Sequence, residues 1–394
     1  MKSVSGIFSS SSPYKPFLIS LALNAVGFGL FKGVSDNYMA EVVHMMEFDR
    51  GLTEFFRELP GLLLIVILAV FRSASAERMY SWGMMIMTIG MACLVFVPPF
   101  KWPVILTIFF YSIGEHIQLG MRNTLSLEYA KTGSGGSALG IQNAMYQIGN
   151  LTGFVIVIAA FWLIPGTKLF TPTFLTATAC FLLGTLCCVR LKSRSKGDPT
   201  KSRFYFRKKF KKYYLLEVFY GARKQVFFTF GPYVLILFYK ADTSTISLLF
   251  AISAALCFLI SPLVGRLIDR IGYKIVMIMD TILLFFVCFF YGFAHHLFSM
   301  EVAFIICCVN YVLDSIISLA SMASNVYVQD ISKDNQEMRA TISTGISVNH
   351  MITIFIALLG GWIWKVLGIE TLFILSAFLG LCNSAYAATI KKTD

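Results

Sequence analysis

Twelve apolar, charge-poor runs divide this chain, and each is long enough to cross a lipid bilayer as a helix. About 20 helical residues span a hydrocarbon core of roughly 30 Å. A backbone in lipid must satisfy its hydrogen bonds internally, which favours helices. The sequence therefore predicts an all-α polytopic membrane protein with 12 transmembrane helices. The runs cover residues 17–39, 52–72, 80–98, 102–128, 138–164, 170–190, 213–239, 244–264, 275–294, 300–327, 339–364 and 370–390.

The composition excludes an ordinary soluble domain. Hydrophobic residues make up 57% of the 394 residues and charged residues only 14%, whereas soluble domains carry about 25% charged residues. We expect no cleavable signal peptide, because the first apolar run is too long for a signal core and no small-residue cleavage site follows it. The nine cysteines lie inside apolar runs without zinc-ligand spacing to histidine, so they are predicted to be packing residues.

The basic residues indicate an orientation. If the N-terminus is cytoplasmic and the chain alternates, 23 of the 33 Lys and Arg residues lie inside, five lie outside and five lie within spans. This asymmetry follows the positive-inside rule and predicts a cell membrane protein, inner or plasma, with both termini cytoplasmic. The net charge of +12 then needs no nucleic-acid partner. Segment 190–212 alone holds eleven basic residues; it is either an anchor on the anionic inner leaflet or a docking site for a cytosolic partner.

The basic segment divides the chain near its midpoint. We predict an N-terminal six-helix bundle at residues 1–190, a cytoplasmic linker at 191–212 and a C-terminal six-helix bundle at 213–394. A faint internal repeat supports this division, because LEYAKTGSGGSALG and VYVQDISKDNQEMRATI both read as a helix end, a polar turn and a new helix, about 200 residues apart. Two pseudo-symmetric bundles are typical of transporters, with the substrate site near mid-membrane. We expect a monomer in the bilayer.

The loop GRLIDRIGYK, residues 265–274, makes a family resemblance specific. It is similar to the Gly-x-Leu-x-Asp-Arg-x-Gly-x-Lys signature of the major facilitator superfamily. In that family the loop lies on the cytoplasmic side and acts as a gate, since its glycines allow a tight turn and its carboxylate can accept bonds from a helix N-terminus or an arginine. The matching residues are Gly265, Asp269, Arg270, Gly272 and Lys274.

The corresponding loop of the first half is eroded. FRSASAERMY, residues 71–80, keeps only Arg72, Glu77 and Arg78. We therefore expect an asymmetric gate in which the C-terminal half dominates.

The resemblance implies that the first and fourth helices of each half line a central cavity. Glu115 and His116 lie at the middle of the fourth span, and Asp314 lies at the middle of the tenth, 199 residues after Glu115. A charge at bilayer depth costs several kcal/mol unless it faces a partner or a watery cavity. Two acids at matching positions therefore favour a functional site over a packing accident.

Polar residues recur at helical spacing on three spans. On lipid-embedded helices such stripes mean either a polar cavity or buried helix contacts. Span ten is predicted to carry one continuous stripe. The stripes are Glu115, Gln118, Arg122 and Ser126 on span four; Asn310, Asp314, Ser318, Ser321 and Asn325 on span ten; and Ser343, Ser347, Asn349 and His350 on span eleven.

Other charges in the spans leave alternatives open. Arg57 can pair with Glu54 in a structural salt bridge, or Glu54, Arg57 and Glu58 together can gate the outer mouth. Lys32 and Asp36 are four residues apart and suit mutual pairing.

Five further positions are assigned less directly. Arg223 or Lys224 can counter Asp314 or attract an anionic substrate group. Asp280 is expected to be a capping or gate residue. His295 and His296 lie at an outer helix end and are expected to be solvated.

These features predict a secondary active transporter that moves a small polar, zwitterionic or anionic organic solute. Segment GSGG at 133–136 lacks the Lys-Ser/Thr ending of a phosphate-binding loop, so we expect an ion gradient, most simply of protons, to supply energy. Glu115, His116, Asp314 and His350 can change charge near neutral pH when buried. We expect no metal and no cofactor. The alternatives are an exporter or flippase of amphiphilic, lipid-like or drug-like compounds, a non-transporting sensor, or a membrane enzyme using Glu115 and His116.

The orientation can be tested with a single reactive cysteine at Gly197 in the basic linker. We expect an impermeant thiol reagent added to intact cells to leave this cysteine unlabelled, because the linker lies in the cytoplasm. Permeabilised cells should restore labelling. Labelling from outside in intact cells would overturn the topology.

Overall fold

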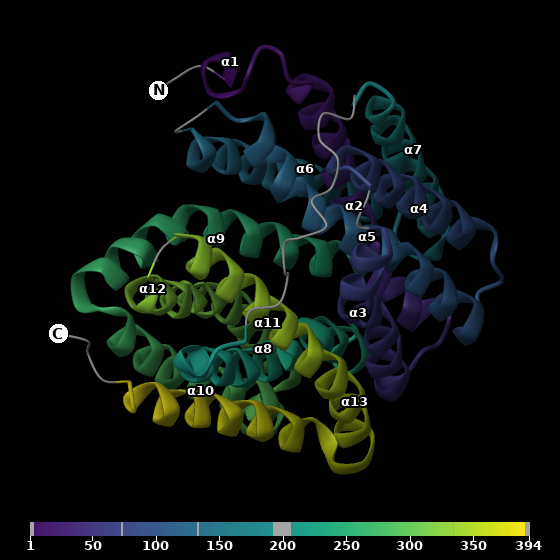
Figure 1. Ribbon diagram of the computed structural model, residues 1–394. Coiled ribbons are helices and arrows are strands. Elements are labelled where there is room, and N and C mark those ends of the chain that lie inside the picture. The colour runs from purple at the N-terminus through teal and green to yellow at the C-terminus, as the bar shows by residue number, and fades with distance from the viewer. Residues whose placement is uncertain (1–3, 72–73, 132–133, 192–205, 334, 391–394) are drawn as a thin grey trace. The chain divides into compact units, whose positions relative to one another are not determined.

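The computed structural model describes residues 4–71, 74–131, 134–191, 206–333 and 335–390. Within these ranges the chain is helical, and the one bridge of extended backbone joins Phe8 to Ala130 (Figure 1). The helices are α1 Val4–Ile7, α2 Tyr14–Glu41, α3 Glu47–Val70, α4 Ala76–Phe96, α5 Lys101–Tyr129, α6 Gly135–Leu163, η1 Thr167–Leu169, α7 Phe170–Cys188, η2 Lys208–Phe210, α8 Lys211–Leu237, α9 Thr243–Ile271, α10 Tyr273–Leu297, α11 Met300–Ile317, η3 Ser318–Ser321, α12 Met322–Ile331 and α13 Asn335–Ala388.

Nine helical segments of the described chain are long and apolar enough to cross a membrane. Helices α3 and α8 are not among these nine segments; both correspond to predicted spans that hold charges. They count α13 as one segment, although Gly368, with a φ of 90°, breaks it into two helices. The predicted all-α polytopic class is confirmed, and the number of twelve spans stays a prediction.

The contacts divide the chain into two compact units. Unit 1 comprises Met1–His44, Leu59–Thr200 and Thr243–Ala251, and unit 2 comprises Met45–Glu58, Lys201–Asp242 and Ile252–Asp394. Helices α3 and α9 therefore each begin in one unit and end in the other. The bundle boundaries at residues 190 and 213 stay a prediction, and the sharing of α3 and α9 was not anticipated from the sequence.

In unit 1, α2 packs along α6 and α7, and α4 packs along α5 and α7. Glycines allow the close crossing of α2 and α6. A Cβ added at Gly153 would lie 2.6 Å from the Leu30 backbone nitrogen and 2.6 Å from the Val26 carbonyl oxygen. Gly149 and Gly153 form a Gly-x-x-x-Gly pattern, which brings membrane helices into backbone contact because small residues leave no side chain between them.

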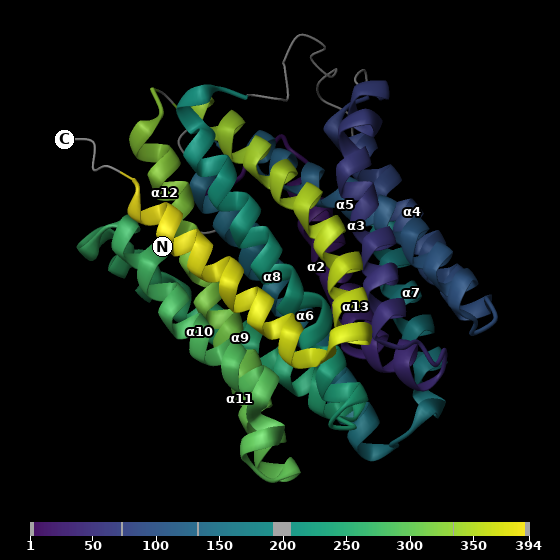
Figure 2. The same ribbon diagram turned by 90° about the horizontal axis from the view of Figure 1, so that it is seen from below.

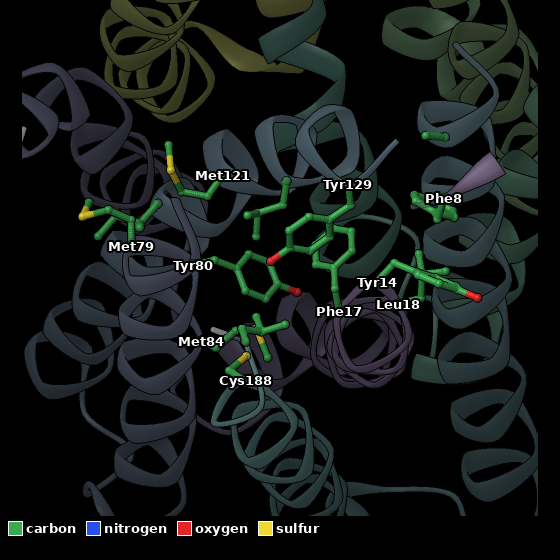
Figure 3. Packing of buried hydrophobic residues seen from close by; sticks show 14 of the residues in the cluster. Phe8, Tyr14, Phe17, Leu18, Met79, Tyr80, Met84, Met121, Tyr129 and Cys188 are labelled. Atoms are coloured by element: carbon green, nitrogen blue, oxygen red, sulfur yellow. The ribbon is translucent and has the colours of Figure 1, made fainter. Parts of the chain in front are cut away.

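Aromatic rings join α2, α4 and α5 at one end of unit 1. Figure 3 shows the rings of Phe17, Tyr80 and Tyr129 gathered together, and the Phe17 centroid lies 5.5 Å from that of Tyr80 and 5.7 Å from that of Tyr129. Both contacts are edge-to-face, the geometry that aromatic quadrupoles favour. Cys188 of α7 packs in the same cluster, and its sulfur lies 3.3 Å from the Ser20 hydroxyl. The cluster thereby joins α2, α4, α5 and α7.

Unit 2 repeats this pattern of neighbours. Helix α8 packs along α13, and α10 packs against α13 and α11 (Figure 2). Close approaches at glycines recur here, since a Cβ at Gly345 would collide with the Tyr213 ring. The first part of α3 also packs in this unit, where the Tyr233 hydroxyl donates to the Met45 carbonyl at 2.7 Å.

The predicted polar stripe on span ten is interrupted. Helix α11 ends at Ile317, and the chain continues as a 3₁₀ turn, Ser318–Ser321, before α12 begins. A 3₁₀ turn has three residues per turn in place of 3.6, so it rotates the residues that follow. Asn325 is consequently exposed and Ser324 is the buried residue. The prediction of one continuous stripe through Asn325 was wrong for this reason.

We expect Gly153→Ala to lower the stability of the protein by about 1–3 kcal/mol, because its Cβ would meet backbone atoms of α2 that have no room to move. Gly140→Ala on the same helix is the matched control, since nothing lies within 4 Å of its Cβ position. Thermal unfolding of the purified protein in detergent provides the measurement. Equal melting temperatures for both variants would contradict the packing argument.

Candidate functional site

A buried arginine lies between two aspartates in the core of unit 2. Arg223 of α8 has an Nη2 atom 3.8 Å from Oδ2 of Asp280 on α10, and its Nη1 atom is 3.9 Å from Oδ1 of Asp314 on α11. The three residues are exposed by only 1%, 8% and 7%. One cation and two carboxylates thus share a water-poor site, which we call the Arg223 triad.

The triad is loosely bonded. Among the described residues, no hydrogen-bond partner exists for Nε, Nη1 or Nη2 of Arg223 or for Oδ1 of Asp314. The separations exceed the 2.7–3.2 Å of an N–H···O bond, so the arginine attracts both acids without being locked to either. An unpaired buried polar atom is costly, and the arrangement therefore favours a further group, such as a proton or water, at this point.

Packing on each helix fixes the triad. The Thr281 hydroxyl lies 3.2 Å from Asp280 Oδ1 and 3.2 Å from the Gly380 carbonyl, which holds α10 against α13. Arg223 also lies over the Tyr220 ring, with its guanidinium carbon 5.2 Å from the centroid. Asp280 was predicted to be a capping or gate residue. The capping role was wrong, since this aspartate lies in the interior of α10 and faces Arg223, and the gate role stays a prediction.

A small pocket adjoins the triad. Asp280 contributes to its lining, and so does Asn383, whose buried Oδ1 has no hydrogen-bond partner in the described chain. Ser324 also lines the pocket and donates to Glu217 Oε1 at 2.9 Å. Asn349 donates to the other oxygen of that glutamate at 3.2 Å. The full lining is Leu216, Tyr220, Met277, Asp280, Ala320, Ser321, Ser324 and Asn383.

A second charged cluster in unit 2 links the first part of α3 to α8 and α13; we call it the α3 network. Glu54 accepts from Arg50 at 2.8 Å, from Arg57 at 2.6 Å and from Gln225 of α8 at 3.3 Å. Arg57 also pairs with Glu58. The predicted pair of Arg57 and Glu54 is present, as one part of a larger network.

The α3 network reaches α13 through His350. The Nδ1 atom of His350 lies 2.8 Å from Glu58 Oε2, across 292 positions of sequence. Glu54 and Glu58 are buried, with exposures of 0% and 5%. The network contains two arginines, two glutamates and one histidine, so its net charge depends on whether the imidazole carries a proton.

The candidate residues of unit 1 lie on α2 and α5. Lys32 and Asp36 form the predicted pair, with Nζ and Oδ2 2.9 Å apart. Glu115 is half-buried and His116 is buried. The His116 Nδ1 lies 2.9 Å from the Ser112 carbonyl oxygen, one turn earlier on its own helix.

Two more residues of α5 have defined partners. Arg122 lies over the Tyr146 ring of α6, with a distance of 4.2 Å to the centroid. Gln118 is buried and contacts Asn24 Oδ1 at 3.4 Å. Glu115 and Arg122 both act electrostatically on Tyr146, so this tyrosine is the common neighbour of the two charges. Whether these side chains bind substrate stays a prediction.

The remaining candidates of unit 2 differ in exposure. Asn310 is buried and donates to the Ile306 carbonyl of its own helix at 2.9 Å, whereas Lys224 is exposed.

In the signature loop, Gly272 turns the chain with a φ of 87° between α9 and α10. Lys274 donates to the Ile390 carbonyl at 2.8 Å. This contact holds the C-terminal end of α13.

The gate residues of the signature loop are open to solvent. Asp269 and Arg270 are exposed, and the described residues provide no hydrogen bond or ion pair to either of them. Of the first-half loop, Arg72 lies outside the described residues. Glu77 is buried, and neither of its carboxylate oxygens has a hydrogen-bond partner in the described ranges.

Sequence reasoning missed several members of these clusters. Arg50 was placed in an outer loop, although its spacing of four from Glu54 is a helical pairing signal. Glu217 and Asn383 were not among the predicted site residues. No pattern in the sequence joins Glu217 to Ser324 and Asn349, because these contacts cross between helices.

Comparison with known proteins agrees with this architecture. Residues 213–393 match the family model of the Major Facilitator Superfamily. No curated protein matches the chain in sequence.

Among solved structures, a mutant of the nucleoside transporter NupG is similar with a TM-score of 0.77 at 15% identity, covering 96% of this chain and 100% of that one. A POT family transporter in complex with 5-aminolevulinic acid gives a TM-score of 0.72 at 12% identity, covering 94% of each chain. A bacterial homologue of the human lysosomal transporter Spinster gives 0.69 at 14% identity, covering 96% of this chain and 97% of that one.

The C-terminal half thus matches the Major Facilitator Superfamily in sequence, and the chain has the fold of solved transporters. The resemblance predicted from residues 265–274 is confirmed by the family match over the C-terminal half and by the fold. The sequence match of the C-terminal half and the transporter fold favour a transporter over an enzyme.

We expect Arg223→Gln to destabilise the protein by about 3–5 kcal/mol, because it leaves two buried carboxylates without their cation. Asp280→Asn should cost less, since it leaves one matched pair. The double variant Arg223→Gln with Asp314→Asn should recover part of the loss. Thermal unfolding in detergent measures all three, and equal effects of the two single variants would contradict the charge balance described for the triad.

Proposed function

We propose that this protein is a proton-coupled secondary active transporter for a small polar, zwitterionic or anionic organic solute. It acts in the cell membrane, inner or plasma, with both termini in the cytoplasm. The observation that carries the proposal is the Arg223 triad, in which one buried cation lies between two buried acids with no hydrogen bond to either. Such a site changes its net charge by one when it takes up a proton.

The charge balance gives the coupling mechanism. With both aspartates ionised, the Arg223 triad carries one excess negative charge in a low-dielectric interior, which is unfavourable. A proton on Asp280 or Asp314 neutralises the triad, and Arg223 can then draw close to the acid that stays ionised. Release of the proton reverses this shift. The protein therefore has two side-chain arrangements that differ by one proton, as coupling requires.

The polar side chains at the small pocket beside Asp280 are proposed as the route for that proton. Ser324 and Asn383 line it, and Ser324 bonds to Glu217. Glu217 lies closer to the start of α8 than Arg223, which is the cytoplasmic side in the predicted orientation. Hydroxyl, amide and carboxylate groups in this order can conduct a proton through ordered water.

Glu115 is a second candidate for the coupling residue, with His116 as the group that tunes it. Its helix belongs to unit 1, where Arg122 and Tyr146 are the nearby polar groups. In this variant of the proposal Asp314 is the counterpart of Glu115 in the other half. Variants of the two acids distinguish the alternatives.

The substrate class rests on the mixture of signs among the cavity candidates. Lys32, Arg122, Lys224 and the acids offer both charges, which suits a zwitterion or a polar metabolite better than an apolar drug. Similar folds carry nucleosides, peptides or 5-aminolevulinic acid according to their names. Export of amphiphilic compounds is the alternative, since 37 phenylalanines provide abundant apolar surface.

The α3 network is proposed as the outer gate. It fastens the first part of α3 to α13 through the contact between Glu58 and His350. Pro60 follows directly and lacks a backbone N–H, which weakens the helix at that point. Protonation of His350, or loss of its contact with Glu58, would change how tightly α13 holds the first part of α3. The exposed Asp269 and Arg270 are proposed to act as the cytoplasmic gate.

The test uses protein in proteoliposomes that contain a pH-sensitive dye. A panel of amino acids, short peptides, nucleosides and organic acids is screened for solute-driven proton entry. With a substrate identified, Asp314→Asn is expected to reduce uphill accumulation at least tenfold and to leave counterflow exchange measurable, because coupling and recognition are separate steps. Glu115→Gln is measured in parallel.

The control is Asp242→Asn, an exposed acid outside both clusters, which should accumulate substrate like the parent. Normal accumulation by Asp314→Asn and Asp280→Asn would rule out the Arg223 triad as the coupling site. Loss in Glu115→Gln alone would assign coupling to α5. If substrate movement in the parent protein were insensitive to a proton gradient, proton coupling itself would be wrong.

A further inference from the structure

Two histidines and a glutamate meet at one end of unit 2, away from the Arg223 triad. His295 and His296 end α10, and Glu370 lies two residues after the break in α13 at Gly368. The Nε2 atoms of His295 and His296 lie 3.3 and 2.8 Å from the same carboxylate oxygen, Glu370 Oε1. The donor atoms of all three residues lie within 4.8 Å of one another.

We propose that His295, His296 and Glu370 form a binding site for a divalent transition-metal ion, with Zn²⁺ the best fit. Neutral imidazole nitrogens and a carboxylate oxygen are ligands that zinc takes in this combination. Bonds of about 2.0–2.1 Å at tetrahedral angles place neighbouring donor atoms about 3.3 Å apart. The observed separations of 2.8 and 3.3 Å need only small side-chain shifts to match this geometry.

The backbone brings the donors together. Gly368 has a φ of 90°, and a Cβ there would lie 2.6 Å from Glu370 Oε2. Only glycine therefore allows the chain to turn while the carboxylate folds back toward α10. A Cβ at Gly292 would lie 3.4 Å from the Glu370 Cα, so this part of α13 packs directly on α10. The glutamate is positioned by close helix packing as well as by its own rotamer.

The surroundings suit a metal site better than a simple ion pair. The two imidazole rings lie 3.9 Å apart, so two protonated rings would repel each other. A single metal ion replaces both protons and satisfies the shared carboxylate. The His295 ring packs on Phe238 with a centroid distance of 4.8 Å, and its side chain is only 11% exposed. His296 is 56% exposed, which leaves an entry path and room for a water ligand.

The site has a structural consequence that is independent of transport. It joins the end of α10 to the beginning of the last helical segment of α13. In the predicted orientation both ends face the outside, where metal ions from the medium can reach them. An ion that binds only the folded protein raises its apparent stability in proportion to its concentration and affinity.

The test uses purified full-length protein whose polyhistidine tag has been removed and whose metal has been stripped with a chelator. Zinc chloride is titrated by calorimetry, and melting temperature is measured with and without the ion. We expect one zinc ion per chain at this site and a higher melting temperature. His296→Ala and Glu370→Gln should each weaken this binding at least tenfold, because loss of even an indirect partner of a metal ligand has an effect of that size.

His44→Asn is the matched control, since His44 is another exposed histidine and asparagine tolerates its positive φ of 58°. It should bind zinc like the parent. Cobalt should give the visible absorption of a tetrahedral centre in the parent and lose it in His296→Ala. Absence of zinc binding by the parent, or equal affinity in His296→Ala, Glu370→Gln and the parent, would overturn the proposal and leave the cluster as a hydrogen-bonded helix contact.

Discussion

The cost of burying charge governs the interior of this protein. Two unit charges 4 Å apart attract by about 4 kcal/mol at an effective dielectric constant of about 20, while removal of each ion from water costs several kcal/mol. In the Arg223 triad, one arginine at 3.8 and 3.9 Å must compensate two acids. One positive charge cannot cancel two negative charges, so the triad is not neutral when both acids are ionised. The proposed coupling depends on this imbalance, because a single proton removes it. A fully bonded pair would be more stable and could not switch as easily.

Close helix packing is what keeps such a site dry. Glycines let the backbones of α2 and α6 touch, and at the crossing of α8 with α13 they make room for side chains such as the Tyr213 ring. A rigid framework also limits how far a charged side chain can move to find another partner. Arg223 consequently stays at the distance set by α8, α10 and α11. The electrostatic property of the triad therefore depends on apolar packing elsewhere in the unit.

The fold class and part of the site could be predicted from the sequence, because apolar run length, basic-residue asymmetry and residues 265–274 are local signals. Asp314 followed from helical position, and Arg223 was one of two candidate counter-charges for it, which the structure places 3.9 Å away. Asp280 was misassigned, since its depth in α10 gives no hint of which helix it faces. The contact of Glu58 with His350 joins segments 292 positions apart, and the 3₁₀ turn before α12 left no clear pattern. Such features arise from tertiary packing.

Helix α8 connects the two charged clusters of unit 2. Gln225 bonds to Glu54 in the α3 network, and Arg223, two residues earlier, belongs to the triad. Glu217, further back on the same helix, bonds to Asn349 of α13, which lies next to His350 in the sequence. A shift of α8 that shortens one of the Arg223 contacts would also move the Gln225 amide away from or toward Glu54. In the proposed mechanism, α8 would therefore link proton uptake at the triad to the hold on α3, because one helix carries residues of both clusters.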